Sequence, residues 1–231
     1  MEPMYRVEDK YSCDERAMTL IQARLKSVLR PDKNQTKDDG YKITSVYFDD
    51  YYDTHLHETV DGYRLRQKYR VRIYNDSFQT IKLEVKYKKD SRVFKKAQNI
   101  TTDQLKLLLA GECLPDEQPS FDSTVTLFNL AIANRGLAPK VIVEYDRAAY
   151  VFDAGNVRIT LDRNLRSSTD FDGFVQGNQA HYLPVPSFDR VVEIKYDEFL
   201  PGFIAGLLET GNMNQTSYSK YRICREAVTI F

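Results

Sequence analysis

Basic residues occupy every second position between positions 64 and 72 of the sequence. They are Arg64, Arg66, Lys68, Arg70 and Arg72, and most of the intervening residues are apolar. In an extended strand, residues two positions apart project from the same face, so this segment predicts one almost entirely cationic face. Closely spaced Arg and Lys side chains bind the oxygen atoms of phosphate and carboxylate groups, so this pattern favours an anionic ligand.

A second segment repeats the alternation, with Lys82, Glu84, Lys86 and Lys88 on one face. Turn-forming residues at positions 75–77 favour a hairpin, so the two cationic faces would lie side by side. Like charges that face each other across an antiparallel pair repel unless water or an anion covers them. Water is one explanation, since a half-exposed sheet has a solvated polar side. Solvated faces usually mix the two signs of charge, however, and only one of these nine positions is acidic, which favours an anion.

Glutamate precedes lysine by two positions on three predicted strands. The pairs are Glu8 and Lys10, Glu84 and Lys86, and Glu193 and Lys195. Carboxylates brought together from such strands can hold Mg²⁺ or Mn²⁺, and lysines beside them can bind the phosphate oxygens that the metal also contacts. Arg158, Thr160 and Asp162 form a further polar face of the same kind.

Other catalytic motifs are absent from the sequence, which has no GxxxxGK[ST] phosphate loop, no GxSxG nucleophile elbow and no HExxH motif. His55 and His57 lie near a Tyr-rich turn, and we expect both to be exposed loop residues. Cys13, Cys113 and Cys224 are far apart and have no histidine pair nearby. They predict buried reduced thiols, not a disulfide framework or a zinc site.

The chain of 231 residues has no net charge, yet its charges are strongly segregated. Residues 64–96 contain twelve Lys or Arg and three acidic residues, so the rest of the chain carries the balancing negative charge. Nucleic-acid-binding proteins more often have a basic total, so nucleic acid is not an expected partner. No apolar run approaches the roughly 18 residues of a membrane span, and the N-terminus lacks the order of a secretory signal. We therefore expect a cytoplasmic protein without a membrane segment.

Periodicity and capping residues predict both strands and helices. Strands rich in Val, Ile, Tyr and Phe are predicted near residues 5–11, 43–48, 63–74, 80–88, 141–151, 157–161 and 191–196. Helices are predicted after capping boxes at Ser12 and Thr101, ahead of Gly136, and near residues 202–210 and 218–228. Without a repeat or a linker, residues 1–231 are expected to form one domain. The expected fold is α+β, with an antiparallel β-barrel of about eight strands and peripheral helices.

These motifs together resemble a known family. In chain order they are Tyr5-Arg-Val-Glu8-Asp-Lys10-Tyr11, Ser45-Val-Tyr47-Phe48-Asp49, Arg66-x-Lys68-x-Arg70-x-Arg72-x-Tyr74, Leu83-Glu84-Val-Lys86, Arg158-Ile-Thr160-Leu-Asp162, Glu193-Ile-Lys195-Tyr196 and Ser219-Lys220-Tyr221. From about Tyr5 to about Tyr221 the chain resembles the VTC domain, the polyphosphate polymerase domain of the vacuolar transporter chaperone complex. That domain belongs to the triphosphate tunnel metalloenzymes. The resemblance therefore implies antiparallel strands that close into a tunnel lined by Lys, Arg and Glu.

The resemblance and the alternation together imply roles for particular residues. The set expected to act on the reacting phosphates is Lys10, Arg70, Arg72, Lys86, Arg158 and Lys220. The further residues expected to bind substrate are Arg66, Lys68, Lys82, Lys88, Lys95, Lys96, Arg147, Lys195 and Ser219, with only one of Lys95 and Lys96 entering the tunnel. Glu193 is the implied principal ligand of Mn²⁺ or Mg²⁺, and Glu8 and Glu84 are further candidates. Simple alternation places Arg147 with Val143 and Tyr145 unless a bulge intervenes.

One position departs from the wider superfamily. Members of that superfamily open with E-x-E-x-K, whereas here Arg6 replaces the first glutamate, as fits the VTC branch. The resemblance implies a metal-dependent phosphotransferase that adds the terminal phosphate of ATP to polyphosphate. Two alternatives stay open: an inorganic triphosphatase or polyphosphatase, and a non-catalytic module that binds polyphosphate or triphosphate, together with an unidentified protein partner. Arg6 disfavours the hydrolase, while Glu193 and Lys10 disfavour the binding module.

Overall fold

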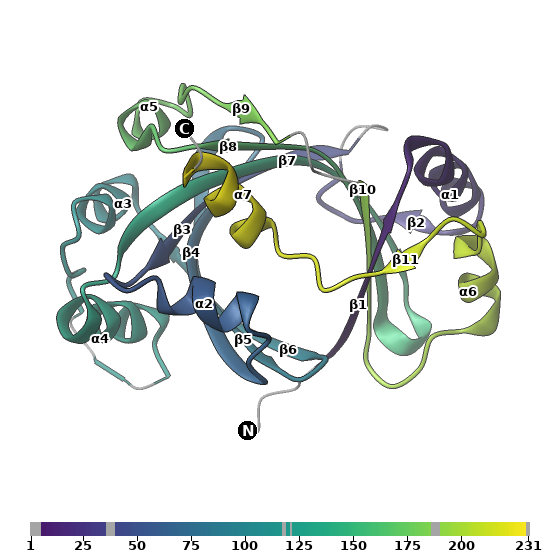
Figure 1. Cartoon of the computed structure of the whole chain (residues 1–231), viewed down its shortest axis with the longest axis horizontal. Coiled ribbons are helices and arrows are strands. Elements are labelled where there is room, and N and C mark those ends of the chain that lie inside the picture. The colour runs from purple at the N-terminus through teal and green to yellow at the C-terminus, as the bar shows by residue number, and fades with distance from the viewer. Residues whose placement is uncertain (1–5, 36–39, 117–118, 121, 186–189, 230–231) are drawn as a thin grey trace.

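The computed structural model describes residues 6–35, 40–116, 119–120, 122–185 and 190–229. Eight strands form a closed ring in the order β7, β3, β4, β5, β6, β1, β10 and β8, and β8 pairs again with β7 (Figure 1). Every neighbouring pair in this ring is antiparallel. The ring strands are β1 Arg6–Cys13, β3 Tyr41–Asp49, β4 Leu65–Tyr74, β5 Ser77–Lys89, β6 Arg92–Ile100, β7 Ala138–Phe152, β8 Val157–Ser168 and β10 Arg190–Tyr196. The expected α+β fold with about eight antiparallel strands is therefore confirmed.

The remaining elements surround this ring. Three short strands extend the sheet: β2 Arg30–Pro31, β9 Leu183–Pro184 and β11 Asn214–Gln215. The helices are α1 Glu15–Val28, α2 Thr54–Val60, α3 Thr102–Leu109, α4 Thr124–Arg135, α5 Phe171–Val175, α6 Gly202–Leu208 and α7 Lys220–Thr229, with a 3₁₀ turn at Ala154–Asn156. Figure 1 shows α3 and α4 on one side of the ring and α1 and α6 on the other.

Apolar residues on the outer face of the ring form two separate cores. One packs Val71 and Leu83 of the ring against Phe128 of α4 and its neighbours. The other packs Ile159 of β8 against Ile21 of α1, together with residues of α6 and β10. Full burial of one such side chain contributes roughly 1.5–3 kcal/mol. The strands are therefore held from outside by the helices, which leaves their inner face available for polar residues.

A third apolar cluster lies inside the ring and involves α7. Tyr221 and Cys224 of this helix pack with Tyr47 of β3 and with Val143 and Tyr145 of β7. In Figure 1, α7 lies in front of the space that the strands surround. The C-terminal helix thus covers part of the ring interior and brings its first residues to the inner face.

The ring has one weak seam, between β1 and β6. Within the described part of the chain, Arg6 and Val7 are the only β1 residues that pair with β6, opposite Val93 and Arg92. Beyond that point β1 pairs with β11 instead, through Tyr11 and Ser12. The segment 214–219, which comprises β11 and the link to α7, therefore completes the ring wall where β6 diverges.

Most local predictions are confirmed, with a correction at the start of α1. Thr101 and Gln104 form the predicted capping box, and Gly136 ends α4 with a φ of 63°. The cap of α1 is Asp14, whose side chain accepts a hydrogen bond from the Ala17 amide, and is not Ser12. The prediction at Ser12 was wrong because β1 continues to Cys13, where it still pairs with Arg190 of β10.

Two predictions about exposure also need correction. His55 is 2% exposed because its imidazole packs against Asp49 at 2.8 Å, whereas His57 is exposed as expected. Both lie in α2 and not in a loop, so the loop prediction was wrong for each of them. Cys113 is exposed, while Cys13 and Cys224 are the expected buried thiols. Among the described helices, none combines the length and the apolar character needed to cross a membrane.

Candidate functional site

The inner face of the ring encloses a cavity of about 580 Å³ to which all eight ring strands contribute. Of the lining residues that the structure describes, thirteen are Lys or Arg and three are acidic. The predicted basic residues that line it are Lys10, Arg66, Lys68, Arg70, Arg72, Lys86, Lys88, Lys95, Arg147, Arg158, Lys195 and Lys220, and Ser219, Glu8 and Glu193 lie among them. Residues from widely separated segments of the sequence therefore meet in one basic cavity.

Three predicted residues do not line the cavity. Lys82 lies toward the hairpin end of β5, whereas the cavity lining on that strand begins at Lys86. Lys96 follows Lys95 on β6 and therefore points to the opposite face, where it pairs with Asp122 at 2.7 Å. Glu84 is fully buried behind the cavity wall and contacts two cations. Lys95, and not Lys96, is the residue of that pair that reaches the cavity.

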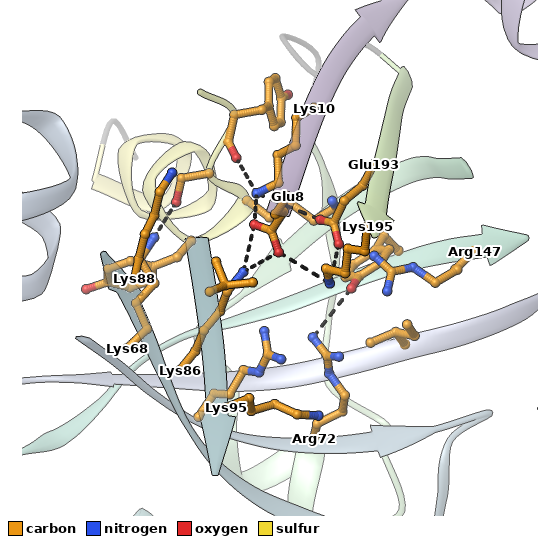
Figure 2. A pocket seen from close by; sticks show the side chains of 18 of the residues that line it. Glu8, Lys10, Lys68, Arg72, Lys86, Lys88, Lys95, Arg147, Glu193 and Lys195 are labelled. Atoms are coloured by element: carbon orange, nitrogen blue, oxygen red, sulfur yellow. Dashed lines mark hydrogen bonds and ion pairs between the residues drawn. The ribbon is translucent and has the colours of Figure 1, made fainter. Parts of the chain in front are cut away.

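Two of the three Glu-x-Lys pairs meet on neighbouring strands. β1 and β10 pair so that Glu8 lies opposite Lys195 and Lys10 lies opposite Glu193. The four side chains form a square of alternating charge, with Lys195 at 2.5 Å from Glu193 and 3.3 Å from Glu8. Figure 2 shows Lys10 and Lys86 completing the contacts of the Glu8 carboxylate, at 3.2 and 2.8 Å.

These contacts fix the ionisation of Glu8, Lys10 and Glu193. Burial raises the pKa of Glu8 and Glu193, but the surrounding lysines outweigh burial and hold both pKa values well below the usual range. Burial likewise lowers the pKa of Lys10, while Glu8 and Glu193 raise it by more. Both carboxylates and Lys10 are therefore charged at neutral pH, within a site that is largely closed to solvent.

Two fully buried carboxylates each hold one arginine and one lysine at the cavity wall. Glu84 contacts Arg70 and Lys95, both at 2.5 Å. Asp162 receives two hydrogen bonds from the Arg147 guanidinium, at 2.6 and 2.7 Å, and one from Lys220 at 2.6 Å. Because Lys220 begins α7, Asp162 also ties this helix to the ring. The sequence pattern placed Asp162 on a polar face but did not single it out as a counter-ion.

Four of the thirteen cations form no ion pair with any described residue. They are Arg66, Lys68 and Arg72 of β4 and Lys88 of β5. Arg72 is 7% exposed, and among the described residues it donates hydrogen bonds only to the hydroxyls of Ser45 and Tyr145, at 3.1 and 3.5 Å. Burial and the neighbouring lysines hold the pKa of Lys68 well below its usual value. The strand pair β4 and β5 thus presents four basic side chains to the cavity without an acidic partner among the described residues.

The segment 214–219 crosses the ring interior and contacts this basic surface (Figure 1). The Thr216 amide donates to the Lys10 carbonyl at 2.9 Å, and Lys10 Nζ donates to the Tyr218 carbonyl at 3.2 Å. Lys68 Nζ donates to the Ser219 hydroxyl at 2.7 Å. The predicted residues Lys10, Lys68 and Ser219 are therefore held together by this segment, a link that the sequence pattern did not reveal.

The remaining predicted cations lie on β7 and β8. Arg147 shares its strand face with Tyr145, as alternation predicts, and both line the cavity because that face turns inward. The pairing shift between β7 and β8 lies before it, between Glu144 and Asp146. Arg158 donates to Asp32 at 2.8 Å and to the Tyr41 hydroxyl at 3.0 Å.

The carboxylates offer a partial set of metal ligands. No group of three or more His, Cys, Asp or Glu residues suited to a metal ion occurs in the described parts of the chain, so Glu84 does not join Glu8 and Glu193. Mg²⁺ is commonly bound by one or two carboxylates together with substrate phosphates and water. Two ionised carboxylates next to lysines of the cavity fit a divalent metal held jointly with an anionic ligand.

The lowered pKa of Lys86 leads us to expect that anion binding depends on pH. Burial lowers its pKa to about 7, with Lys10 and Lys195 adding to the effect and Glu8 opposing it. A bound polyanion stabilises the charged form and raises this pKa, so binding takes up a proton and affinity falls as the pH rises through about 7. Calorimetric titration with tripolyphosphate between about pH 6 and 8.5 should show a loss of up to about tenfold per pH unit.

Lys86→Arg is the control for this pH dependence, since arginine stays charged throughout that range. The titration of tripolyphosphate itself is common to both proteins and cancels in the comparison. Identical pH profiles for the two proteins would show that Lys86 does not titrate near pH 7.

A closed antiparallel ring around a basic cavity is the arrangement expected of a triphosphate tunnel protein. The chain matches the VTC domain family over residues 5–229, and it belongs to this family. Among solved structures it is similar to a Bacillus halodurans protein provisionally named an adenylate cyclase, with a TM-score of 0.51 and 14% identity over 84% of this chain and 82% of that one. The PH1819 protein of Pyrococcus horikoshii OT3 has a TM-score of 0.48 and 14% identity, over 96% of this chain and 99% of that one. At such identity the first likeness concerns the fold alone, and a search of the curated proteins finds no match.

Proposed function

We propose that this protein is a metal-dependent phosphotransferase that adds the terminal phosphate of ATP to polyphosphate. The observation that supports this most is the row of cations without ion pairs on β4 and β5, inside a cavity enclosed by the ring. Placing like charges on adjacent strands is unfavourable unless an anion compensates them. A linear chain of phosphates carries charge at each unit and suits a row of cations better than a single small anion does.

The side chains of this cavity would bind and orient the reacting phosphates. Phosphoryl transfer requires in-line placement of the two phosphate groups and neutralisation of their charge more than it requires a protein nucleophile. Arg70 and Arg147 are fixed by buried carboxylates, so they would hold phosphate oxygens with little reorganisation. Glu193 and Glu8 would hold Mn²⁺ or Mg²⁺, which when bound would neutralise charge on the transferred phosphate.

The acidic residues favour transfer to a phosphate over transfer to water. A hydrolase usually positions water with a carboxylate base. All three acids that line the cavity contact cations: Glu8 and Glu193 contact lysines, and Asp32 accepts from Arg158. Arg6 stands at the position where the wider superfamily has a further glutamate. Its guanidinium contacts Asp197 at 2.8 Å. These contacts support a cavity that holds an anionic acceptor.

The test is to incubate the purified protein with ATP and Mn²⁺ and to quantify chain growth and free phosphate in the same reaction. We expect ADP and lengthening polyphosphate on a stained gel, with free phosphate well below the amount of ADP. Stoichiometric free phosphate without longer chains would instead identify a hydrolase. Tight polyphosphate binding with no turnover would identify a binding module.

A further inference from the structure

The hydroxyl of Ser219 lies beside a lysine amine inside the cavity. Ser219 is half-buried, lines the cavity and immediately precedes α7. Its Oγ lies 2.7 Å from Lys68 Nζ and accepts a hydrogen bond from the Arg222 amide at 3.3 Å. The bond from Arg222 caps α7, so the helix holds this hydroxyl in place. A hydroxyl within hydrogen-bond reach of an amine has the geometry of a nucleophile and its base.

Lys68 is placed to accept the proton of this hydroxyl. Its amine forms no ion pair with the described residues, so no carboxylate among them stabilises its charged form. Four nearby cations act on this amine: Lys10, Lys86, Arg66 and Lys88. Burial and these cations hold the pKa of Lys68 well below its usual value, so the neutral amine is more readily available. Pairs of serine and lysine serve as nucleophile and base on other folds.

Three phenols of the cavity have partners of a different kind. Tyr41, Tyr47 and Tyr145 each accept a hydrogen bond from an arginine, at 3.0, 3.1 and 3.5 Å. Arginine stays charged in proteins and has no acceptor atom, so it cannot take up a proton. Ser219 differs from these phenols because its partner can act as a base.

The residues on both sides of Ser219 are tied to the groups proposed to hold the reacting phosphates. The Tyr218 carbonyl accepts a hydrogen bond from Lys10 at 3.2 Å, and Lys10 belongs to the square of alternating charge on β1 and β10. Lys220 contacts the buried Asp162 at 2.6 Å. Figure 2 shows Lys10 and Lys68 pointing into the same cavity. The Ser219 hydroxyl therefore faces the space in which the terminal phosphate of a donor nucleotide would lie.

We propose that Ser219 is a self-phosphorylation site, which takes the terminal phosphoryl group of a nucleoside triphosphate when no phosphate acceptor occupies the cavity. The bond from that phosphorus to its bridging oxygen breaks, and a bond from phosphorus to Ser219 Oγ forms. The hydroxyl proton passes to Lys68 Nζ, and the nucleoside diphosphate leaves. The inference rests on the proposed function, because it uses the same donor nucleotide.

The product is a phosphoserine at the N-terminus of α7. The helix dipole and the Lys68 ammonium stabilise its negative charge. Phosphoserine adds about two negative charges to the basic cavity, so the modified protein should bind polyanions more weakly. Self-phosphorylation thus closes the cavity to polyphosphate.

The first test is the mass of the protein after incubation with ATP and Mn²⁺, with and without an excess of tripolyphosphate. We expect one phosphoryl group on the tryptic peptide of residues 196–220, located at Ser219 by fragmentation. Tripolyphosphate should suppress it by filling the acceptor position. Ser219→Asn keeps an N-cap and should take up no phosphate. Lys68→Arg keeps the charge and should still bind tripolyphosphate, but its phosphate uptake should be slower on the order of 10²-fold, because arginine cannot accept the proton.

The second test compares two isosteric variants in metal-free buffer. Ser219→Asp adds a negative charge where Ser219→Asn adds none, and both residues are good N-caps. We expect calorimetry to show tripolyphosphate binding weakened on the order of tenfold by Ser219→Asp relative to Ser219→Asn. Equal affinities would overturn the effect of the modification on polyanion binding.

A wild-type protein that extends polyphosphate but takes up no phosphate at Ser219 would overturn self-phosphorylation and leave the proposed function standing. Undiminished uptake by Lys68→Arg would overturn the role of Lys68 as the base. Phosphate at Ser219 without any chain growth would support this inference and contradict the proposed function. A protein that neither extends chains nor takes up phosphate would overturn both.

Discussion

Glu193→Gln is expected to lower metal-dependent turnover by about 10²-fold or more while the protein stays folded. Glutamine preserves the shape of the side chain but removes the charge of one of the two carboxylates that face each other diagonally across β1 and β10. Lys195 and Lys10, which contact Glu193 at 2.5 and 3.8 Å, keep Glu8 as a partner, so the square retains one counter-ion. The loss should therefore appear in metal use and not in the fold.

The measurement is turnover of ATP against Mn²⁺ concentration, together with the unfolding midpoint without ligand. Glu198→Gln is a matched control, because it makes the same chemical change at an exposed position just after β10. We expect the Glu193 variant to need more Mn²⁺ and to stay slow at saturation, while the Glu198 variant behaves as the wild type. A folded Glu193→Gln protein with full Mn²⁺-dependent turnover would show that Glu193 is not the metal ligand.

The strand alternation in the sequence predicted which side chains share a face, but not which faces meet. Glu8 with Lys10 and Glu193 with Lys195 share faces as predicted, because the period of a strand is local. The same pattern at Glu84 and Lys86 gave no indication that Glu84 is buried between Arg70 and Lys95. Whether a carboxylate joins a site or neutralises its wall depends on the order of the strands in the ring, which is a long-range property.

Contacts between distant segments were the other feature that periodicity could not supply. Asp162 contacts Lys220, 58 positions away, and Lys68 contacts Ser219, 151 positions away. β6 was not predicted as a strand, because residues 97–99 are polar or small and exposed, and only pairing with β5 defines them as one. The resemblance to the VTC domain supplied the expected ring, and the pairing of the strands explains how these residues reach it.

The last prediction separates two neighbouring arginines that the sequence cannot tell apart. Arg70 is paired with the fully buried Glu84, whereas Arg72 has no acidic partner among the described residues and lies near Arg70. Arg70→Ala should lower the free energy of unfolding by about 1.5–3 kcal/mol, because Glu84 loses one of its two cations. Arg72→Ala should leave it within about 1 kcal/mol of the wild type, because relief of repulsion offsets the lost hydrogen bonds to hydroxyls.

Both variants should nevertheless lose chain growth, on the order of 10²-fold, since each removes a fixed cation from the phosphate path. Denaturant unfolding without ligand gives the stabilities, and gel analysis of polyphosphate gives the length and yield of the product. The informative result is an Arg72→Ala protein that has wild-type stability but makes few or short chains. It would show that the Arg72 guanidinium serves the ligand and not the fold. If Arg72→Ala is as unstable as Arg70→Ala, or if it extends chains normally, Arg72 does not bind the growing polyphosphate, and the row of unpaired cations on β4 no longer supports a polymerase.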